Sequence, residues 1–159
     1  MRYGTGQYRA PDAARQTAAR RPTRTHPEMT PHPEAAAPRR KILLVDDSAT
    51  THMWIGMILN KSEYEMVSAR DGEEGVERAL AELPDLILMD VVMPRMDGFE
   101  ACRRLRAHRA TRATPIVMVT TRAEARNVET GFSSGCSDYI TKPIDGLELL
   151  SKVRSFLGE

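Results

Sequence analysis

Three short runs of consecutive apolar residues stand out along the chain, at Ile42–Val45, Leu86–Met89 and Ile116–Val119. Unbroken apolar runs of this length are typical of strands that are buried on both faces, as in a parallel sheet covered by helices. Two weaker strand candidates, at residues 65–69 and 138–141, mix apolar with polar positions. The pattern therefore predicts five short strands.

Amphipathic stretches that carry helix-start signals lie between these strands. A side chain able to cap a helix precedes four of the stretches, and Glu74 stands at capping-box spacing from one of the caps. The four caps are Ser48, Asp71, Asp97 and Asp145. The predicted helices run from Ser48 to about Asn60, from Asp71 to Glu82, over Gly98–Ala107, over 122–134, and from Asp145 to Leu157. Five strands alternating with five helices predict an α/β domain with a doubly wound parallel sheet, because right-handed crossovers put helices on both faces.

The first 40 residues have a different composition. They contain no Ile, Leu, Val, Phe or Trp, and Arg, Ala, Pro and Thr supply 27 of the 40 positions. Such a segment buries too little apolar surface to offset the entropy that it would lose on ordering. We therefore predict a disordered extension over residues 1–39 and a folded domain over residues 40–159. The Arg-rich extension is interpreted as a solvated tail or as a weak arm for polyanions or for an acidic partner; a third interpretation, an organelle transit peptide, is weakened by six prolines and a lack of Ser.

Charge and composition exclude several classes of protein. The chain carries 23 Lys and Arg against 22 Asp and Glu, so direct DNA binding is not expected. No apolar run approaches the roughly 18 residues of a membrane span, and no signal-peptide core follows Met1. With only Cys102 and Cys136, a disulfide framework or a cysteine zinc site is excluded, and we expect a cytoplasmic protein. His52 and His108 have no ligand partner at metal spacing and are expected at the surface.

Polar residues stand at the ends of the predicted strands. They are Asp46 and Asp47 after the first strand, Asp90 after the third, Thr120 after the fourth and Lys142 after the fifth. Because the carboxyl ends of parallel strands meet at one edge, where doubly wound sheets bind their ligands, we expect these side chains to converge. Three neighbouring carboxylates repel one another unless a cation offsets them. A divalent cation with oxygen ligands such as Mg²⁺ is the natural partner.

The same edge is suited to phosphoryl transfer. Mg²⁺ bound by one or two carboxylates keeps open positions at which phosphate oxygens can bind. Thr120 and Lys142 can then donate to those oxygens. A carboxylate can serve as the acceptor in such a reaction, which is governed mostly by positioning and by charge neutralisation.

These residues and the segments around them resemble the receiver domain of two-component response regulators, in particular chemotaxis-type stand-alone receivers. The resemblance covers about residues 40–159 and rests on four segments, Ile42–Asp47, Leu86–Gly98, Pro115–Thr121 and Asp138–Pro143. It implies a flavodoxin-like strand order, 2-1-3-4-5. It implies that Asp90 accepts a phosphoryl group from a phosphohistidine and that Thr120 and Lys142 bind the phosphoryl oxygens. The implied Mg²⁺ ligands are Asp47, Asp90, the main-chain carbonyl of Val92 and, through water, Asp46.

The resemblance further implies a switch and a set of partners. Tyr139 stands three residues before Lys142, at the position of the family's switch aromatic. On phosphorylation, Thr120 is expected to move toward the phosphoryl group and the Tyr139 ring to turn inward. The implied partners are a histidine kinase or phosphotransfer protein, a downstream target protein, and a second copy of the chain in a phosphorylation-dependent homodimer. Because only Gly158 and Glu159 follow the last predicted helix, we expect a single-domain response regulator.

Two other functions remain as alternatives. A Mg²⁺-dependent phosphatase with an aspartyl nucleophile needs a second Asp two residues after the nucleophile. The residues at that spacing from Asp46, Asp47 and Asp90 are Ser48, Ala49 and Val92. A receiver-like scaffold that works without phosphorylation is disfavoured because all five polar strand-end residues are present. We therefore expect a phosphoacceptor that catalyses only its own phosphorylation and dephosphorylation.

The first predicted helix carries a candidate docking patch. At about 100° per residue, the sheet-facing side gathers Thr51, Ile55, Ile58, Leu59 and Ser62. Met53 and Met57 then point away from the sheet, and Trp54 lies on the flank. Trp54 and Met57 are interpreted as an adaptable apolar anchor for a kinase or phosphotransfer helix. The alternative is that Trp54 packs on the edge of the core and that the methionines are incidental.

Overall fold

The fold centres on a five-stranded sheet, seen in a computed structural model that describes residues 37–59, 63–121 and 128–159. The strands are β1 (Arg40–Val45), β2 (Tyr64–Ala69), β3 (Leu86–Asp90), β4 (Ile116–Thr121) and β5 (Asp138–Lys142). Their order across the sheet is β2-β1-β3-β4-β5, and every neighbouring pair is parallel. The predicted parallel sheet and the strand order implied by the family resemblance are both confirmed.

The burial of each strand follows its place in the sheet. The three apolar runs lie in β1, β3 and β4, which occupy the interior of the sheet, and the residues of these runs are almost fully shielded from solvent. The two mixed segments form β2 and β5, which are the edge strands. Exposed positions recur along β2, because an edge strand has a neighbour on one side only. The difference in composition therefore reflects the difference in position.

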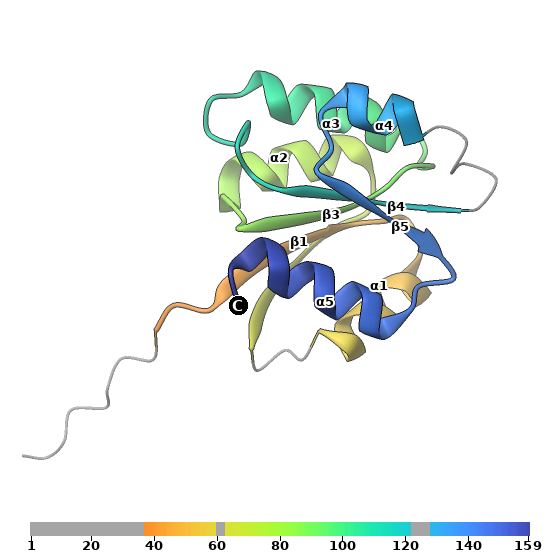
Figure 1. Cartoon of the computed structure of the whole chain (residues 1–159). Helices are drawn as coiled ribbons and strands as arrows, with labels where there is room; N and C mark the ends of the chain where they lie inside the picture. The colour runs from red at the N-terminus through yellow and green to blue at the C-terminus, as the bar shows by residue number, and fades with distance from the viewer. Residues whose placement is uncertain (1–36, 60–62, 122–127) are drawn as a thin grey trace, which may run out of the picture. The chain divides into compact units, whose positions relative to one another are not determined.

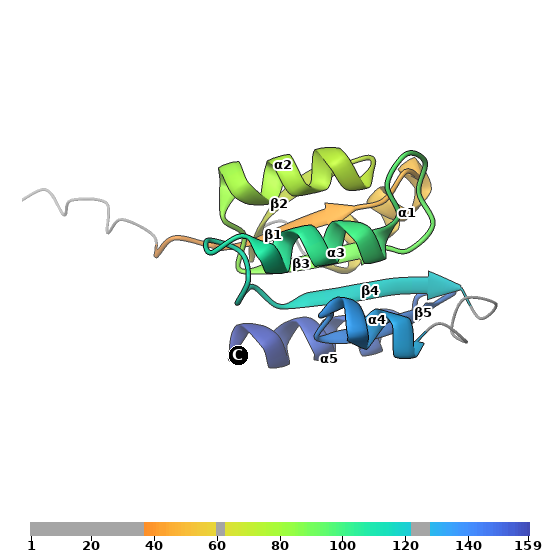
Figure 2. The same cartoon turned by 90° about the horizontal axis from the view of Figure 1, so that it is seen from above.

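In the part of the chain that the structure describes, five helices cover the two faces of the sheet, as Figure 1 illustrates. They are α1 (Ala49–Ile58), α2 (Gly72–Glu82), α3 (Gly98–Ala107), α4 (Val128–Ser134) and α5 (Gly146–Leu157). Figure 2 shows α2, α3 and α4 on one face, with α3 between the other two, whereas α1 and α5 lie on the opposite face. Each face has its own apolar core. Val76 and Leu105 belong to the core under α2 and α3, and Ile55 and Val153 to the core under α1 and α5.

The predicted caps begin four of the helices. The Ser48 hydroxyl accepts a hydrogen bond from the Thr51 amide at 3.3 Å. The carboxylates of Asp71, Asp97 and Asp145 each accept from the amide three residues on, at 2.8–2.9 Å. Such bonds satisfy amides that the first turn of a helix leaves without a partner. Each cap thus fixes the residue at which its helix begins. Ser48, Asp71 and Asp145 lie within three residues of the end of the preceding strand, so their helices begin just beyond the carboxyl edge of the sheet.

The boundaries differ from the predictions at two helices. Helix α1 ends at Ile58 rather than near Asn60, because Leu59 leaves the helical conformation and buries its side chain completely. Helix α4 is described only as Val128–Ser134, and the start predicted at residue 122 lies outside the described residues. Residues 1–36 of the predicted extension and Ser62 also lie outside them. Within the described part of the chain, every helix is too short or too polar to cross a membrane.

Candidate functional site

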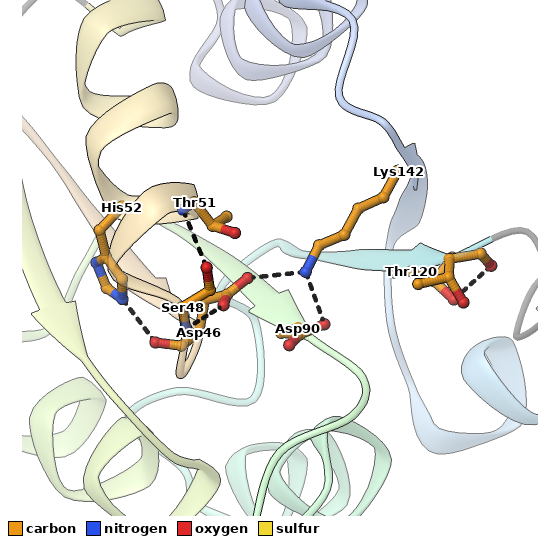
Figure 3. A network of polar contacts seen from close by, with 8 residues as sticks. Asp46, Ser48, Thr51, His52, Asp90, Thr120 and Lys142 are labelled. Carbon is orange, nitrogen blue, oxygen red and sulfur yellow. Dashed lines mark hydrogen bonds and ion pairs between the residues drawn. The ribbon is translucent and has the colours of Figure 1, made fainter.

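Three carboxylates and the ammonium of Lys142 meet at the carboxyl edge of the sheet, and Figure 3 shows Lys142 reaching to Asp46 and Asp90. Asp46 and Asp47 follow β1, Asp90 ends β3, and each offers a carboxylate oxygen within 4.8 Å of the others. Lys142 ends β5 and donates from Nζ to Asp46 Oδ2 at 3.1 Å and to Asp90 Oδ1 at 3.3 Å. The structure thus brings together four of the five strand-end residues singled out in the sequence. The peptide bond between Lys142 and Pro143 is cis.

Asp46 is held at several of its atoms. Its amide donates to the Ala69 carbonyl at 3.1 Å, and its Oδ1 accepts from the Ser48 amide at 2.8 Å. Its own carbonyl lies 2.6 Å from Nε2 of His52, in the first turns of α1. Asp46 is therefore buried and fixed, whereas its neighbour Asp47 is exposed. This asymmetry leaves one carboxylate of the pair accessible to a ligand from solvent.

The contact with His52 was missed by the sequence analysis. His52 is half-buried and not a plain surface residue, and its ring reaches back six positions along the chain to the carbonyl of Asp46. The position of a lone histidine in the first turn of a helix does not predict a contact with a main-chain carbonyl six residues earlier. The sequence signal that does exist is only its closeness to the Asp46–Asp47 pair.

Burial and neighbouring charge perturb the ionisation of the site. Burial, together with the negative charge of Asp46, raises the pKa of Asp90 to about 6 from an ordinary value of 3.8, although Lys142 partly offsets this. Burial alone would lower the pKa of Lys142, but its contacts with Asp46 and Asp90 outweigh burial and raise that pKa. Lys142 is therefore a fixed positive charge, and it does not fully compensate the carboxylates around it.

The donor set fits a hard divalent cation. Carboxylate oxygens are the ligands that Mg²⁺ prefers in proteins, and the Asp46, Asp47 and Asp90 cluster supplies three of them within reach of one another. The cluster sets three carboxylates against the Lys142 ammonium, so negative charge exceeds positive charge there, and after burial the charge of Asp46 contributes to the raised pKa of Asp90. A bound cation would remove this imbalance. The cluster is of the kind that is typical of a magnesium site.

The loop after Asp90 is tightly anchored at Gly98. The Gly98 amide donates to the Val91 carbonyl at 2.8 Å. A Cβ on Gly98 would lie 2.1 Å from the carbonyl oxygen of Asp90, far inside van der Waals contact. Glycine is therefore required for this close approach. Between these anchors, the side chain of Val92 is exposed, so this part of the loop faces solvent.

Thr120 and Tyr139 lie on one face of the sheet next to the site. The Thr120 hydroxyl donates to the Thr121 carbonyl at 3.3 Å, and in Figure 3 it lies away from Asp90 and Lys142. Met118 shares a face of β4 with Thr120 and is the register partner of Tyr139 on β5. The Tyr139 ring meets the Phe132 ring of α4 edge to face, with 6.3 Å between centroids. The two residues of the expected switch are thus close neighbours across two strands.

Helix α1 presents the predicted apolar patch to solvent. Trp54 is 47% exposed and Met57 70% exposed, whereas Ile55 on the sheet-facing side is fully buried. The indole Nε1 of Trp54 donates to the Ile144 carbonyl at 3.4 Å. Trp54 also lines a hollow of about 280 Å³ whose wall includes Lys142. The exposed tryptophan therefore shares a hollow with Lys142, the residue that contacts Asp46 and Asp90.

Comparisons with known proteins point in one direction. A family model described as the response regulator receiver domain matches residues 42–154. The chain is 38% identical to Protein PilH of Pseudomonas aeruginosa over 118 residues, which are 74% of this chain and 98% of PilH. It is 39% identical to the transcriptional regulatory protein ResD of Bacillus subtilis over 117 residues, but spans only 48% of ResD.

Solved structures give the same result. The chemotaxis response regulator CheY4 of Vibrio cholerae has a TM-score of 0.70 at 32% identity, over 76% of this chain and 100% of that one. The receiver domain of the sensor histidine kinase PA1611 from Pseudomonas aeruginosa has a TM-score of 0.70 at 31% identity, over 77% and 100% of the two chains. That structure is described as having a magnesium ion coordinated in the active site cleft.

Proposed function

The chain belongs to the response regulator receiver domain family, and from this premise we propose that it is a single-domain response regulator whose phosphoacceptor is Asp90. The observation that carries the proposal is the meeting of Asp46, Asp47, Asp90 and Lys142 at the carboxyl edge of the sheet. Receiver domains partner with histidine kinases. The donor proposed here is accordingly the phosphohistidine of a histidine kinase or of a phosphotransfer protein.

In the proposed reaction, a carboxylate oxygen of Asp90 attacks the phosphorus atom of the phosphohistidine. A bond between oxygen and phosphorus forms, the bond between phosphorus and the histidine nitrogen breaks, and the electron pair leaves with the imidazole. Lys142 already contacts Asp90, so its ammonium is placed to bind a phosphoryl oxygen, with the Thr120 hydroxyl as a second donor. Asp47, Asp90, the Val92 carbonyl and, through water, Asp46 would hold Mg²⁺, which would supply the positive charge that phosphoryl transfer requires. The magnesium in the PA1611 receiver supports this assignment.

The output of the proposed reaction is a change of surface. The Thr120 hydroxyl makes a long hydrogen bond to its neighbouring carbonyl and would turn to the phosphoryl group instead. Tyr139, on the same face of the sheet, would then move its ring inward, away from Phe132. The surface formed by α4, β5 and α5 changes as a result. We propose that this surface binds a downstream target protein or a second phosphorylated copy of the chain.

The proposed organisation is a receiver over residues 40–159 and an extension over residues 1–39. The match to nearly the full length of PilH supports a protein that works as a receiver alone. ResD is about twice the matched length, so its activity as a transcriptional regulator is not carried over to this chain.

The proposed docking site for the donor helix is the α1 patch, defined as Trp54 and Met57. Both side chains are exposed, and Trp54 lines the hollow that leads to Lys142. A tryptophan beside a flexible methionine is the type of anchor that dominates small interfaces. A helix bound there would bring its phosphohistidine close to Asp90.

Phosphoryl uptake from a small-molecule acyl phosphate tests the proposal. Wild type, Asp90→Ala and Asp85→Ala are incubated with the donor, with and without Mg²⁺, and followed by intact mass. Asp85→Ala is a matched control, because Asp85 lies just before β3 and contacts Arg40. We expect Mg²⁺-dependent uptake by wild type and Asp85→Ala and none by Asp90→Ala. Equal uptake by all three proteins would contradict the assignment.

A further inference from the structure

A charged contact ties the loop after Asp90 to the start of α2. Arg95 donates from Nη2 to Oδ2 of Asp71. The Asp71 side chain is 8% exposed, and its other oxygen caps α2 by accepting from the Glu74 amide at 2.9 Å. The Glu74 amide and Arg95 together hold the pKa of Asp71 below its ordinary value despite burial. Asp71 is therefore an ionised, fixed anchor for Arg95.

Arg95 occupies a backbone conformation that disfavours its own side chain. Its φ is +68°, and Leu83 is the other non-glycine residue with positive φ in the described part of the chain. Glycine adopts this region at no steric cost, whereas other residues are strained there. Position 95 thus carries an arginine in a conformation that suits glycine, and the side chain of this arginine contacts Asp71.

This contact completes a chain of interactions that links the segment of Asp46 to the loop after Asp90. At one end, the Asp46 amide donates to the Ala69 carbonyl at 3.1 Å. Asp71 follows two residues after Ala69, and Arg95 joins it to the loop that begins at Asp90. The start of α2 also packs against this loop, since a Cβ on Gly72 would lie 2.6 Å from the Met96 carbonyl oxygen. Both segments that carry the proposed metal ligands are thus fastened to residues 69–72.

We propose that Arg95 is a positioning residue for Mg²⁺: through Asp71 it holds the loop that carries Val92 against the segment that holds Asp46. The inference rests on the proposed function, because it requires the carboxylate cluster to bind Mg²⁺. When the contact is lost, the loop samples more positions and Mg²⁺ binding weakens. The side chain of Arg95 is 69% exposed, so the expected effect is that of an exposed ion pair, a change of about two- to fivefold in affinity.

The sign of the effect separates positioning from simple electrostatics. Arg95 carries a positive charge, so by Coulomb repulsion alone its removal would tighten the binding of a divalent cation. Positioning predicts the opposite, because the ordered loop favours the bound state. Arg95→Gly therefore gives weaker Mg²⁺ binding if the inference is right and tighter binding if only charge matters.

The test is calorimetric titration of Mg²⁺ into the full chain at fixed, near-physiological ionic strength. The variants are Arg95→Gly, Asp71→Asn and the double variant. Asparagine still caps a helix, so Asp71→Asn removes the charge of the anchor and keeps the cap. The control is Arg104→Ala, which removes one exposed arginine that pairs with Glu100 on α3. We expect both single variants to bind about two- to fivefold more weakly, the double variant to be no weaker than the worse single, and the control to match wild type.

Two further measurements keep the interpretation sharp. Thermal unfolding without Mg²⁺ should show Arg95→Gly to be at least as stable as wild type, because glycine relieves the positive φ; weaker binding by a stable protein is not explained by a damaged fold. Arg95→Gly binding Mg²⁺ as tightly as wild type, or tighter, overturns the inference. The proposed function would still stand after such a result for Arg95→Gly, provided that wild type binds Mg²⁺ and Asp47→Asn does not. If wild type itself binds no Mg²⁺, the proposed function and this inference fall together.

Discussion

Replacing Asp90 by asparagine should stabilise the folded protein in magnesium-free buffer at neutral pH. The Asp90 carboxylate is buried and lies near Asp46 and Asp47, and among the described residues the ammonium of Lys142 contacts it and offsets part of the negative charge. An asparagine keeps the shape of the side chain and an oxygen that can accept from Lys142. It removes the charge that burial and repulsion disfavour. The charge of the proposed phosphoacceptor thus lowers the stability of the folded domain.

The size of the effect follows from the pKa of Asp90. That pKa is about 6, against an ordinary value of 3.8, and each pH unit of difference corresponds to about 1.4 kcal/mol. The ionised carboxylate therefore costs about 3 kcal/mol in the folded state. For a domain of this size, each kcal/mol changes the melting temperature by about 4 °C. Asp90→Asn should melt about 12 °C higher than wild type at pH 8.

The pH dependence has a definite sign. Because the folded-state pKa of Asp90 is raised, the folded protein binds more protons than the unfolded chain between about pH 4 and 6. The folded protein therefore keeps its full stability at a pH below the pKa of Asp90 in the unfolded chain. It loses stability as the pH rises from there through the pKa of Asp90 in the folded protein. The advantage of Asp90→Asn should therefore be complete near pH 8 and small near pH 4.5.

The assay is thermal and denaturant unfolding of wild type and Asp90→Asn in chelator-treated buffer across this pH range. Asp85→Asn serves as the control, because Asp85 is half-buried, contacts Arg40 and Lys41 and should give no gain. Added Mg²⁺ should narrow the difference by stabilising wild type. An Asp90→Asn protein that is no more stable than wild type at pH 8 would refute the reasoning, as would a gain that is the same at pH 4.5.

Three further predictions concern the switch, the docking patch and the extension. Thr120→Ala should retain phosphorylation but lose most of the phosphorylation-dependent change in partner affinity, a coupling of about 1–3 kcal/mol that titrations can resolve; coupling equal to that of wild type would rule out the Thr120 switch. Trp54→Ala combined with Met57→Ala should slow transfer from the cognate kinase and spare transfer from a small-molecule donor, and a parallel fall in both rates would show that the patch supports the fold instead. Deleting residues 1–38 should leave the melting temperature and phosphoryl uptake unchanged, and a large drop in melting temperature would show that the segment packs on the domain.

The sheet could be predicted from sequence because burial leaves a local signature. An interior strand such as Ile42–Val45 is shielded on both faces, so its apolar run is continuous and easily recognised. The helix starts were equally accessible, since a cap such as Asp97 acts on an amide only three residues away. Convergence of the strand-end residues followed from topology alone, because parallel strands place their carboxyl ends on one edge.

Other features of the site depend on contacts between distant segments and were missed. Arg95 meets Asp71 across 24 positions, and His52 folds back onto a main-chain carbonyl; neither pairing has a periodicity or spacing that a sequence reveals. The close approach of Gly98 to Asp90 depends on the path of the intervening loop. The direction of the Thr120 hydroxyl is a choice of rotamer, which no residue pattern specifies.

The most direct test of the central claim is to locate the phosphoryl group. The protein is phosphorylated with a small-molecule acyl phosphate in Mg²⁺, reduced with borohydride, which converts an aspartyl phosphate to homoserine, and digested for peptide mass spectrometry. The account predicts homoserine at position 90 and unmodified Asp46 and Asp47. Modification at another carboxylate, or none at position 90 under conditions in which the intact protein gains phosphate, would contradict it.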